Sequence, residues 1–203
     1  MTHFRTPTLA LIAGACLSLV GTNALAESTY GYNAAGTGNV TATAQVKLSV
    51  TVPKLILLRV GSANTTVDTL AWTAVPSIPA TPTAPSNGNN VGVDWDGAAP
   101  TITAGTQPAA LNVYAWTNAT TATINCVVGT WVGTNSPANA DFAVTTVTGT
   151  LPHPGNDLGS CTSTTIPSRT LASGTWAYVL SGTPASWGAG VHTNTVTYTA
   201  SGV

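Results

Sequence analysis

The sequence contains one alternating pattern that is longer than any ordinary β-strand. In residues 40–52, VTATAQVKLSVTV, every even position is apolar and every odd position is polar. A period of two predicts extended chain with one buried face. The same row continues toward the N-terminus through Tyr30, Tyr32, Ala34, Gly36 and Gly38. As one straight strand, residues 30–52 would span roughly 75 Å, whereas strands in globular domains usually span about 20 Å.

Two arrangements account for this excess length. In the first, the chain bends near residues 36–38 and forms two strands of one domain. In the second, residues 27–38 are an N-terminal extension and residues 39–203 form the domain, with residues 39–52 as its first strand. Such an extension, with an apolar row on one face, is suited to adding to the open edge of a neighbouring subunit. Head-to-tail contacts that do not close on themselves produce filaments.

Residues 1–26 have the features of a secretory signal peptide. A short polar start containing Arg5 precedes the apolar stretch LALIAGACLSLVG and an A-x-A cleavage site at residues 24–26. The apolar stretch is short for a membrane span. The alternative is a lipidated Cys16, but Ala13 stands where a larger aliphatic residue is expected. We therefore expect a secreted protein, extracellular or on the cell surface, with no membrane insertion after cleavage.

Charged residues are sparse throughout the chain. Asp, Glu, Lys and Arg make up 5% of it, and the net charge at pH 7 is −1. Nucleic-acid binding and electrostatic membrane binding both require clusters of Lys and Arg, so neither partner is expected. Monomeric proteins usually carry charge that keeps them apart. A nearly uncharged surface therefore indicates assembly, with a covering of O-glycans as the alternative explanation.

Two cysteines, Cys126 and Cys161, follow the signal peptide. An even pair in an exported protein predicts a disulfide. In the chain-entropy model, closing a loop of this size stabilises the fold by about 3–4 kcal/mol. The alternative is a pair of buried thiols.

Helical periodicity is absent after the signal peptide, and short period-two runs separated by Gly, Pro, Asn and Asp dominate. Besides residues 39–52, the expected strands are 55–58, 70–74, 91–95, 111–115, 122–128, 142–147, 176–180 and 195–200. Such spacing predicts an all-β protein, a β-sandwich of about 8–9 strands. Loops are expected at residues 76–90, which carry four prolines, and at residues 149–160, which lead into Cys161.

No group of residues in the sequence forms a catalytic motif. The chain lacks a G-x-S-x-G nucleophile elbow, and its two histidines after the signal peptide poorly support a metal site. Asp94 and Asp96 resemble the start of a calcium loop, yet the further oxygen ligands of such a loop are missing. A tight Asp-Gly turn is the favoured interpretation. We expect no enzyme activity, no cofactor and no metal.

Six tryptophans follow the signal peptide, and their phase predicts different roles. Trp72 and Trp176 are in phase with apolar strand neighbours and are expected in the core. Trp116 is out of phase with its apolar neighbours, and Trp187 lies in a Gly-rich turn, so both are expected at the surface. Exposed tryptophans can stack on sugar rings, so the alternative function is a secreted carbohydrate-binding or adhesin module that acts as a monomer.

The two ends of the chain resemble a known group of proteins. The alternating N-terminal arm and the closing segment AGVHTNTVTYT, residues 189–199, are similar to those of the spore-coat-U and chaperone–usher pilin group. The resemblance implies an immunoglobulin-like sandwich that is completed by a donor strand from another copy, with assistance from an export chaperone. The candidate donor residues are then Tyr30, Tyr32, Ala34 and Gly36.

The sequence thus predicts a non-enzymatic, exported β-sandwich with a structural role. The expected product is a fibre, pilus or surface coat in which copies of the chain join head to tail. Whether residues 27–38 pair with a neighbour or within their own domain stays open at this point.

Overall fold

The computed structural model describes residues 28–63 and 65–203. The predicted signal peptide, residues 1–26, lies outside the described residues. The chain divides into two compact units, Met1–Val52 and Pro53–Val203.

The second unit is built almost entirely of β-strands. Two short 3₁₀ turns, η1 (Asn139–Asp141) and η2 (Pro184–Ser186), interrupt the strand order. The strands are β1 (Ile56–Val60), β2 (Ala74–Ser77), β3 (Thr101–Ala104), β4 (Leu111–Thr117), β5 (Ala122–Val128), β6 (Phe142–Gly149), β7 (Ser163–Thr165), β8 (Ala172–Leu180) and β9 (Val196–Gly202). The predicted all-β class is therefore confirmed.

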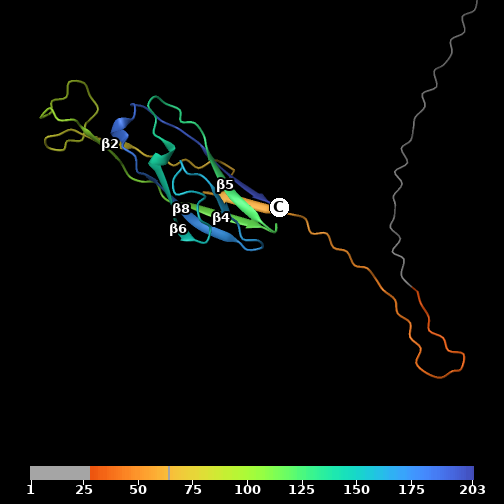
Figure 1. Ribbon diagram of the computed structural model, residues 1–203. Helices are drawn as coiled ribbons and strands as arrows, with labels where there is room; N and C mark the ends of the chain where they lie inside the picture. The colour runs from red at the N-terminus through yellow and green to blue at the C-terminus, as the bar shows by residue number, and fades with distance from the viewer. Residues whose placement is uncertain (1–27, 64) are drawn as a thin grey trace, which may run out of the picture. The chain divides into compact units, whose positions relative to one another are not determined.

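The strands form two main sheets and one hairpin, and every pair of neighbouring strands is antiparallel. The first sheet has the order β1-β4-β8-β6, and the second has the order β7-β5-β9. β2 and β3 pair only with each other among the described strands. In Figure 1, β2 lies at the end of this unit opposite the C-terminus.

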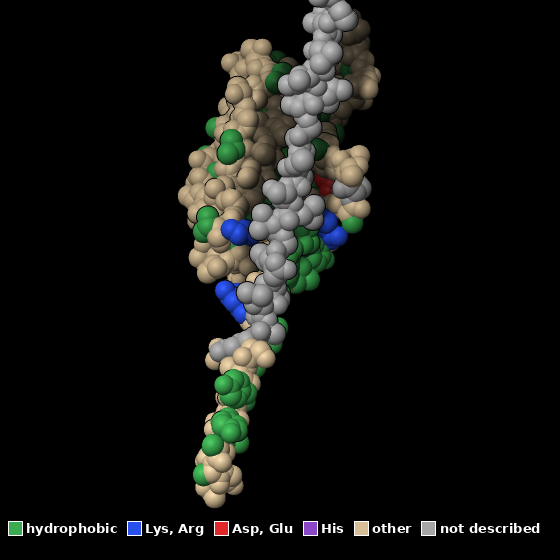
Figure 2. All heavy atoms as spheres, turned by 90° about the vertical axis from the view of Figure 1, so that its right-hand side faces the viewer, with side chains coloured by type: hydrophobic (Ala, Val, Ile, Leu, Met, Phe, Trp, Pro, Cys, Tyr) green, Lys and Arg blue, Asp and Glu red, His purple; other side chains and the backbone are tan. Residues whose placement is uncertain are grey.

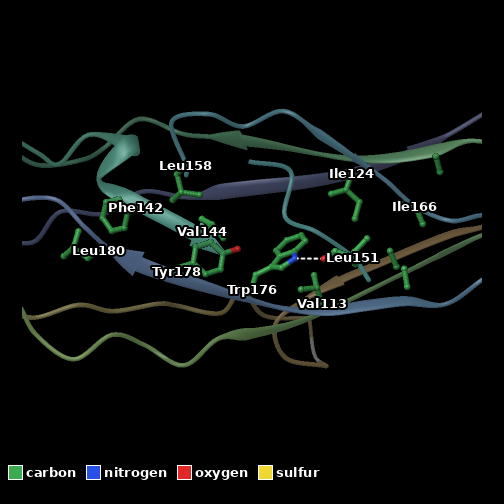
Figure 3. Packing of buried hydrophobic residues seen from close by; sticks show 13 residues of the cluster. Val113, Ile124, Phe142, Val144, Leu151, Leu158, Ile166, Trp176, Tyr178 and Leu180 are labelled. Atoms are coloured by element: carbon green, nitrogen blue, oxygen red, sulfur yellow. Dashed lines mark hydrogen bonds between the residues drawn. The ribbon is translucent and has the colours of Figure 1, made fainter. Parts of the chain in front are cut away.

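The hydrophobic core lies between the two main sheets, as a β-sandwich requires. Inward side chains of the central strands are fully buried, including Val113 of β4, Ile124 of β5 and Trp176 of β8. Figure 3 shows Trp176 among the labelled core side chains, with its indole N–H donating a 2.9 Å hydrogen bond to the Leu151 carbonyl oxygen. That bond satisfies the one polar group that this large side chain brings into the core.

The structure confirms most of the predicted strands and corrects the others. Those expected at 55–58, 111–115, 122–128, 142–147, 176–180 and 195–200 correspond to β1, β4, β5, β6, β8 and β9. Residues 91–95 form no strand, and of the run 70–74 only Ala74 enters one. The sequence did not predict β3 and β7, which are short and rich in Thr and Ser. Both are held by hydrogen bonds from a partner strand rather than by an apolar pattern of their own.

Cys126 and Cys161 form a disulfide, as predicted, with their Cα atoms 5.4 Å apart. Cys126 lies on β5, and Cys161 comes two residues before β7, the strand that pairs with β5. The bridge therefore fixes the loop that precedes β7 against the middle strand of the second sheet.

The first unit forms no strand among its described residues. We expected residues 39–52 to be the first strand of the domain, but they form no ladder, all of them are exposed, and the domain starts with β1. The chain does reverse near Gly36, as the other arrangement expected. There the Gly36 amide bonds the Asn33 carbonyl at 3.2 Å, and the Thr29 hydroxyl bonds the Thr43 carbonyl at 2.8 Å. Apolar–polar alternation predicts which face of a segment is apolar. It does not show whether another strand pairs with that segment.

Candidate assembly site

The two main sheets have four edge strands, and two of these edges are protected. Alongside β6, the Val144 amide donates to the Asn156 carbonyl and the Leu158 amide donates to the Phe142 carbonyl, at 2.8 and 3.0 Å. Residues 156–158 therefore cover that edge. β7 is only three residues long. Short and covered edges are the usual means by which proteins avoid pairing with other chains.

The edges at β1 and β9 have neither protection. Among the described residues, β1 pairs only with β4 and β9 pairs only with β5. Cα atoms of the two strands come within 8 Å of each other, but no ladder joins them. The sandwich is thus unclosed along this side, which we call the β1/β9 edge.

Side chains at the β1/β9 edge are less buried than those of the central strands. The inward residues of both strands pack against the core but remain partly exposed, namely Ile56, Leu58 and Val60 on β1 and Val196, Tyr198, Ala200 and Gly202 on β9. By contrast, Val113 and Ile124 have no exposed surface at all. The core is therefore incompletely covered where the two edge strands meet.

The spacing at this edge bears on how a further strand would fit. Neighbouring strands in a sheet lie about 4.8 Å apart, so a strand between two others needs about 9.6 Å. The closest approaches of β1 and β9 fall below 8 Å. An inserted strand would have to part the two edges by at least about 1.6 Å where they are closest. It would then cover both half-buried rows.

A buried polar network anchors β9 to the opposite sheet. The Tyr198 hydroxyl lies 2.8 Å from Nε2 of His153 and 2.7 Å from the Tyr178 hydroxyl on β8. Nδ1 of His153 lies 2.6 Å from the Gly155 carbonyl oxygen and 3.1 Å from the Gly155 amide nitrogen. The shorter contact favours Nδ1 as the donor, which leaves Nε2 to accept from Tyr198. The His153 ring also stands edge-on to Trp176, with ring centroids 4.8 Å apart.

Burial determines the ionisation of this network. It lowers the pKa of His153 below 6.5, against the smaller opposing effect of the hydrogen bond with Gly155. It raises the pKa of Tyr178 to about 12, although the hydrogen bond with Tyr198 acts in the other direction. Burial raises the pKa of Tyr198 as well, assisted by the charge of Tyr178 and the hydrogen bond to it. All three side chains are therefore neutral near pH 7.

The predicted donor residues lie in the first unit and are exposed. Tyr30 and Tyr32 have 88% and 78% of their surface accessible. Ala34 and Gly36 lie within the turn, where Gly36 adopts a φ of +65°. In this conformation the row is therefore extended only before the turn, and no residue of it meets a partner strand.

A second apolar row in the same unit is uninterrupted by a turn. Val46, Leu48, Val50 and Val52 are 79, 87, 86 and 73% exposed. Figure 2 shows hydrophobic side chains at the surface of the part of the first unit that is not drawn in grey. Branched aliphatic side chains are rarely left exposed in such a row unless they bind a partner. The signal was present in the sequence, but we assigned it to a strand within the domain.

The chain enters the domain through a set of hydrogen bonds made by Asn118, which follows β4. Its side-chain Oδ1 accepts from the Leu55 amide at 2.7 Å, and its Nδ2 donates to the Pro53 carbonyl oxygen at 2.8 Å. The Asn118 amide and the Thr117 hydroxyl both donate to the Leu55 carbonyl, at 3.2 and 3.0 Å. We call this set the Asn118 clamp. It continues the pairing of β1 with β4 beyond Ile56.

The tryptophans partly follow their predicted positions. Trp176 is fully buried, and Trp72 is half-buried against the core. Trp187 is half-buried too and packs against the core, so it is less accessible than expected. Trp95 is the exposed tryptophan, at 57%.

Trp116 lies on the outward face of the first sheet. It pairs with Leu57 in the β1–β4 ladder, and Tyr114 pairs with Arg59. The guanidinium carbon of Arg59 lies 4.1 Å from the centroid of the Tyr114 ring, and Arg59 Nε has no hydrogen-bond partner. These four residues form an outward aromatic patch.

Asp96 and Gly97 form a local turn, as favoured, but no strand precedes it. Asp96 Oδ1 accepts from the Ala98 amide at 2.8 Å, and Gly97 has a φ of +85°. Within the described residues, no three His, Cys, Asp or Glu side chains gather into a potential metal site. No helix of membrane-spanning length and hydropathy occurs in the part of the chain that the structure describes.

Comparisons with protein families, with curated proteins and with solved structures find no match to this chain.

Proposed function

We propose that this chain is a structural subunit of an extracellular fibre, pilus or surface coat. Its copies join head to tail when the N-terminal unit of one copy completes the sandwich of another at the β1/β9 edge. The observation that carries the proposal is the incomplete burial of the core along β1 and β9, two edge strands that do not pair with each other. The chain also contains exposed alternating segments of the kind that could cover this edge.

Strand donation would cover both exposed surfaces, the β1/β9 edge of one copy and the apolar row in the N-terminal unit of another. An added strand supplies main-chain hydrogen-bond partners to an open edge, and its alternate side chains cover the half-buried rows. Fully burying a Val or Leu side chain contributes about 1.5–3 kcal/mol. The neutral surface favours association further, because few like charges oppose it.

Before assembly, the free subunit is expected to be prone to aggregation and to need a protecting partner. An open edge and exposed aliphatic side chains promote uncontrolled aggregation. An export chaperone that covers the β1/β9 edge until assembly is therefore a natural partner. The proposed role requires no catalysis and no cofactor.

The experiment compares unboiled and boiled samples of the protein sheared from the cell surface on an SDS gel. Strand-donated subunits are expected to give a ladder that collapses to one band on boiling. Deleting residues 28–52 should abolish the ladder while leaving a folded domain, measured by circular dichroism. A single monomer band in both lanes of the unaltered protein would contradict the proposal.

A second candidate function rests on the outward aromatic patch of Leu57, Arg59, Tyr114 and Trp116. Two aromatic side chains beside an arginine suit an acidic sugar, which can stack on a ring and pair with the guanidinium group. In this reading the chain is a monomeric carbohydrate-binding module. Its test is quenching of tryptophan fluorescence by an acidic polysaccharide. Saturable quenching that is lost in Trp116→Ala, with Trp95→Ala as the control, would support it.

A further inference from the structure

The proposed assembly does not specify which segment is donated, or whether that segment enters a second copy or its own domain. We infer that residues 46–52 are the donated segment and that the Asn118 clamp commits them to a second copy. This inference rests on the proposed function and adds to it the identity of the donor and the residue that directs it.

Residues 46–52 match the β1/β9 edge better than residues 30–36. They include four large aliphatic side chains on one face, each at least 73% exposed, and only Lys47, Ser49 and Thr51 on the other. Their length equals that of β9, which has seven residues. The row at 30–36 ends in Ala34 and Gly36, which offer little apolar surface, and the chain reverses there.

The Asn118 clamp fixes the residues that immediately precede β1. Only Pro53, Lys54 and Leu55 separate the segment from β1. The clamp binds the main chain of Pro53 and Leu55 to the end of β4, so these residues continue β1 in an extended conformation. Pro53 restricts Val52 to extended conformations as well.

Because residues 53–55 continue β1, the segment before them cannot lie beside β1 of the same domain unless the chain reverses. Reversal within residues 53–55 would break the hydrogen bonds of Asn118, and these residues include none of the Gly or Asn that tight hairpin turns favour. Reversal within residues 50–52 would consume the apolar row itself. The edge of a second copy has neither constraint, so donation between copies is favoured over self-completion.

The first experiment identifies the donor segment in the full-length secreted chain. Leu48→Asp places a charge in the row at 46–52, and Tyr32→Asp places the same charge in the row at 30–36. We expect the SDS-resistant ladder to be lost in L48D and retained in Y32D. Ser49→Asp, on the opposite face of the segment, is the matched control and should retain the ladder. A ladder that survives L48D but disappears in Y32D would overturn the donor assignment and leave the proposed function standing.

The second experiment tests the clamp. A flexible Gly-Ser insert between Val52 and Pro53 frees the segment to fold back. We expect it to replace the ladder by a monomer whose urea midpoint exceeds that of the chain lacking residues 28–52. The same insert after Gly36 should leave the ladder intact. Asn118→Ala is expected to shift material from ladder to monomer in the same direction, with the fold checked by circular dichroism.

The outcomes separate the two hypotheses. If the unaltered chain gives no ladder, the proposed function fails and the inference fails with it. If the ladder persists with the insert after Val52, donation between copies does not depend on the clamp, and the inference fails alone. If the insert abolishes the ladder without producing a stabilised monomer, self-completion is excluded and the role assigned to Asn118 is wrong.

Discussion

The hydroxyl oxygen of Tyr198 on β9 lies 2.7 Å from that of Tyr178 on β8, so the last strand of one sheet is bonded to a central strand of the other. His153 extends this link through its contact with Tyr198. The strand that borders the open edge is thereby fixed from within, and among the described strands only β5 pairs with it.

The first prediction concerns acid. Because the pKa of His153 is lowered in the folded state, the unfolded chain binds more protons as the pH falls below 6.5. The stabilisation from neutral His153 is fully present above pH 6.5 and is lost as the pH falls through the folded-state pKa. Urea unfolding should therefore show a lower midpoint at pH 5.5 than at pH 7.5. His153→Gln should reduce this dependence, and an unchanged slope in H153Q would contradict the assignment.

The second prediction concerns alkali. The pKa of Tyr178 is raised to about 12, so its neutral form is favoured by folding. That contribution is present below pH 10 and is lost as the pH rises from 10 toward 12. Absorbance at the tyrosinate band should show Tyr178 ionising together with unfolding. In Tyr178→Phe the amplitude of the late step should fall, with the buried Tyr198 still contributing to it. The exposed Tyr32 is the control, and its replacement by Phe should leave the late step unchanged.

The third prediction concerns the core. Trp176→Phe removes a fully buried indole and leaves the Leu151 carbonyl without its donor. We expect a loss of about 2–4 kcal/mol in the free energy of unfolding, from the cavity and the unsatisfied group together. Trp95→Phe, at an exposed site, should change it by less than about 0.5 kcal/mol. Equal effects of the two substitutions would show that Trp176 is not central to the core.

The fourth prediction concerns the disulfide. Replacing Cys126 and Cys161 together by Ala should lower the free energy of unfolding by about 3–4 kcal/mol, because the bridge restricts the unfolded chain across 35 residues. Reduction of the unaltered protein should produce a similar decrease. No difference in urea midpoint between the reduced and oxidised protein would contradict the bridge.

The fifth prediction concerns the end of β9. A Cβ atom at Gly202 would lie 2.9 Å from the Cβ of Ala119 and 3.2 Å from that of Ala122. Gly202→Ala should therefore destabilise the domain by about 1–3 kcal/mol through overpacking. Nothing lies within 4 Å of the corresponding position at Gly92, so Gly92→Ala is the matched control and should be close to neutral. Thermal unfolding of the two variants provides the comparison.

Several local features could be predicted from the sequence because they depend on neighbouring residues alone. The alternation around Cys126 predicted the full extent of β5, since apolar residues two apart share one face of a strand. The Asp-Gly turn at Asp96 and Gly97 followed from the conformational freedom of glycine. The pairing of Cys126 with Cys161 followed from their being the two cysteines after the signal peptide.

Other features depended on partners that are distant in the sequence. The polar strand β7 exists because β5 supplies its hydrogen bonds, and His153 is buried because Tyr178 and Tyr198 converge on it from different sheets. Residues 91–95 show an apolar–polar alternation as regular as that of β9. They nevertheless form no strand, because no described strand pairs with them.

The segment at 46–52 shows most clearly the difference between what the sequence determines and what the tertiary structure determines. The sequence by itself determined that one face of this segment is apolar and fit to be buried. Only the tertiary structure decided that the domain begins after it, at Pro53, and that its apolar face is left exposed. The physical reason is that alternation specifies a strand's buried face, whereas the partner that buries it is chosen by the packing of the whole chain.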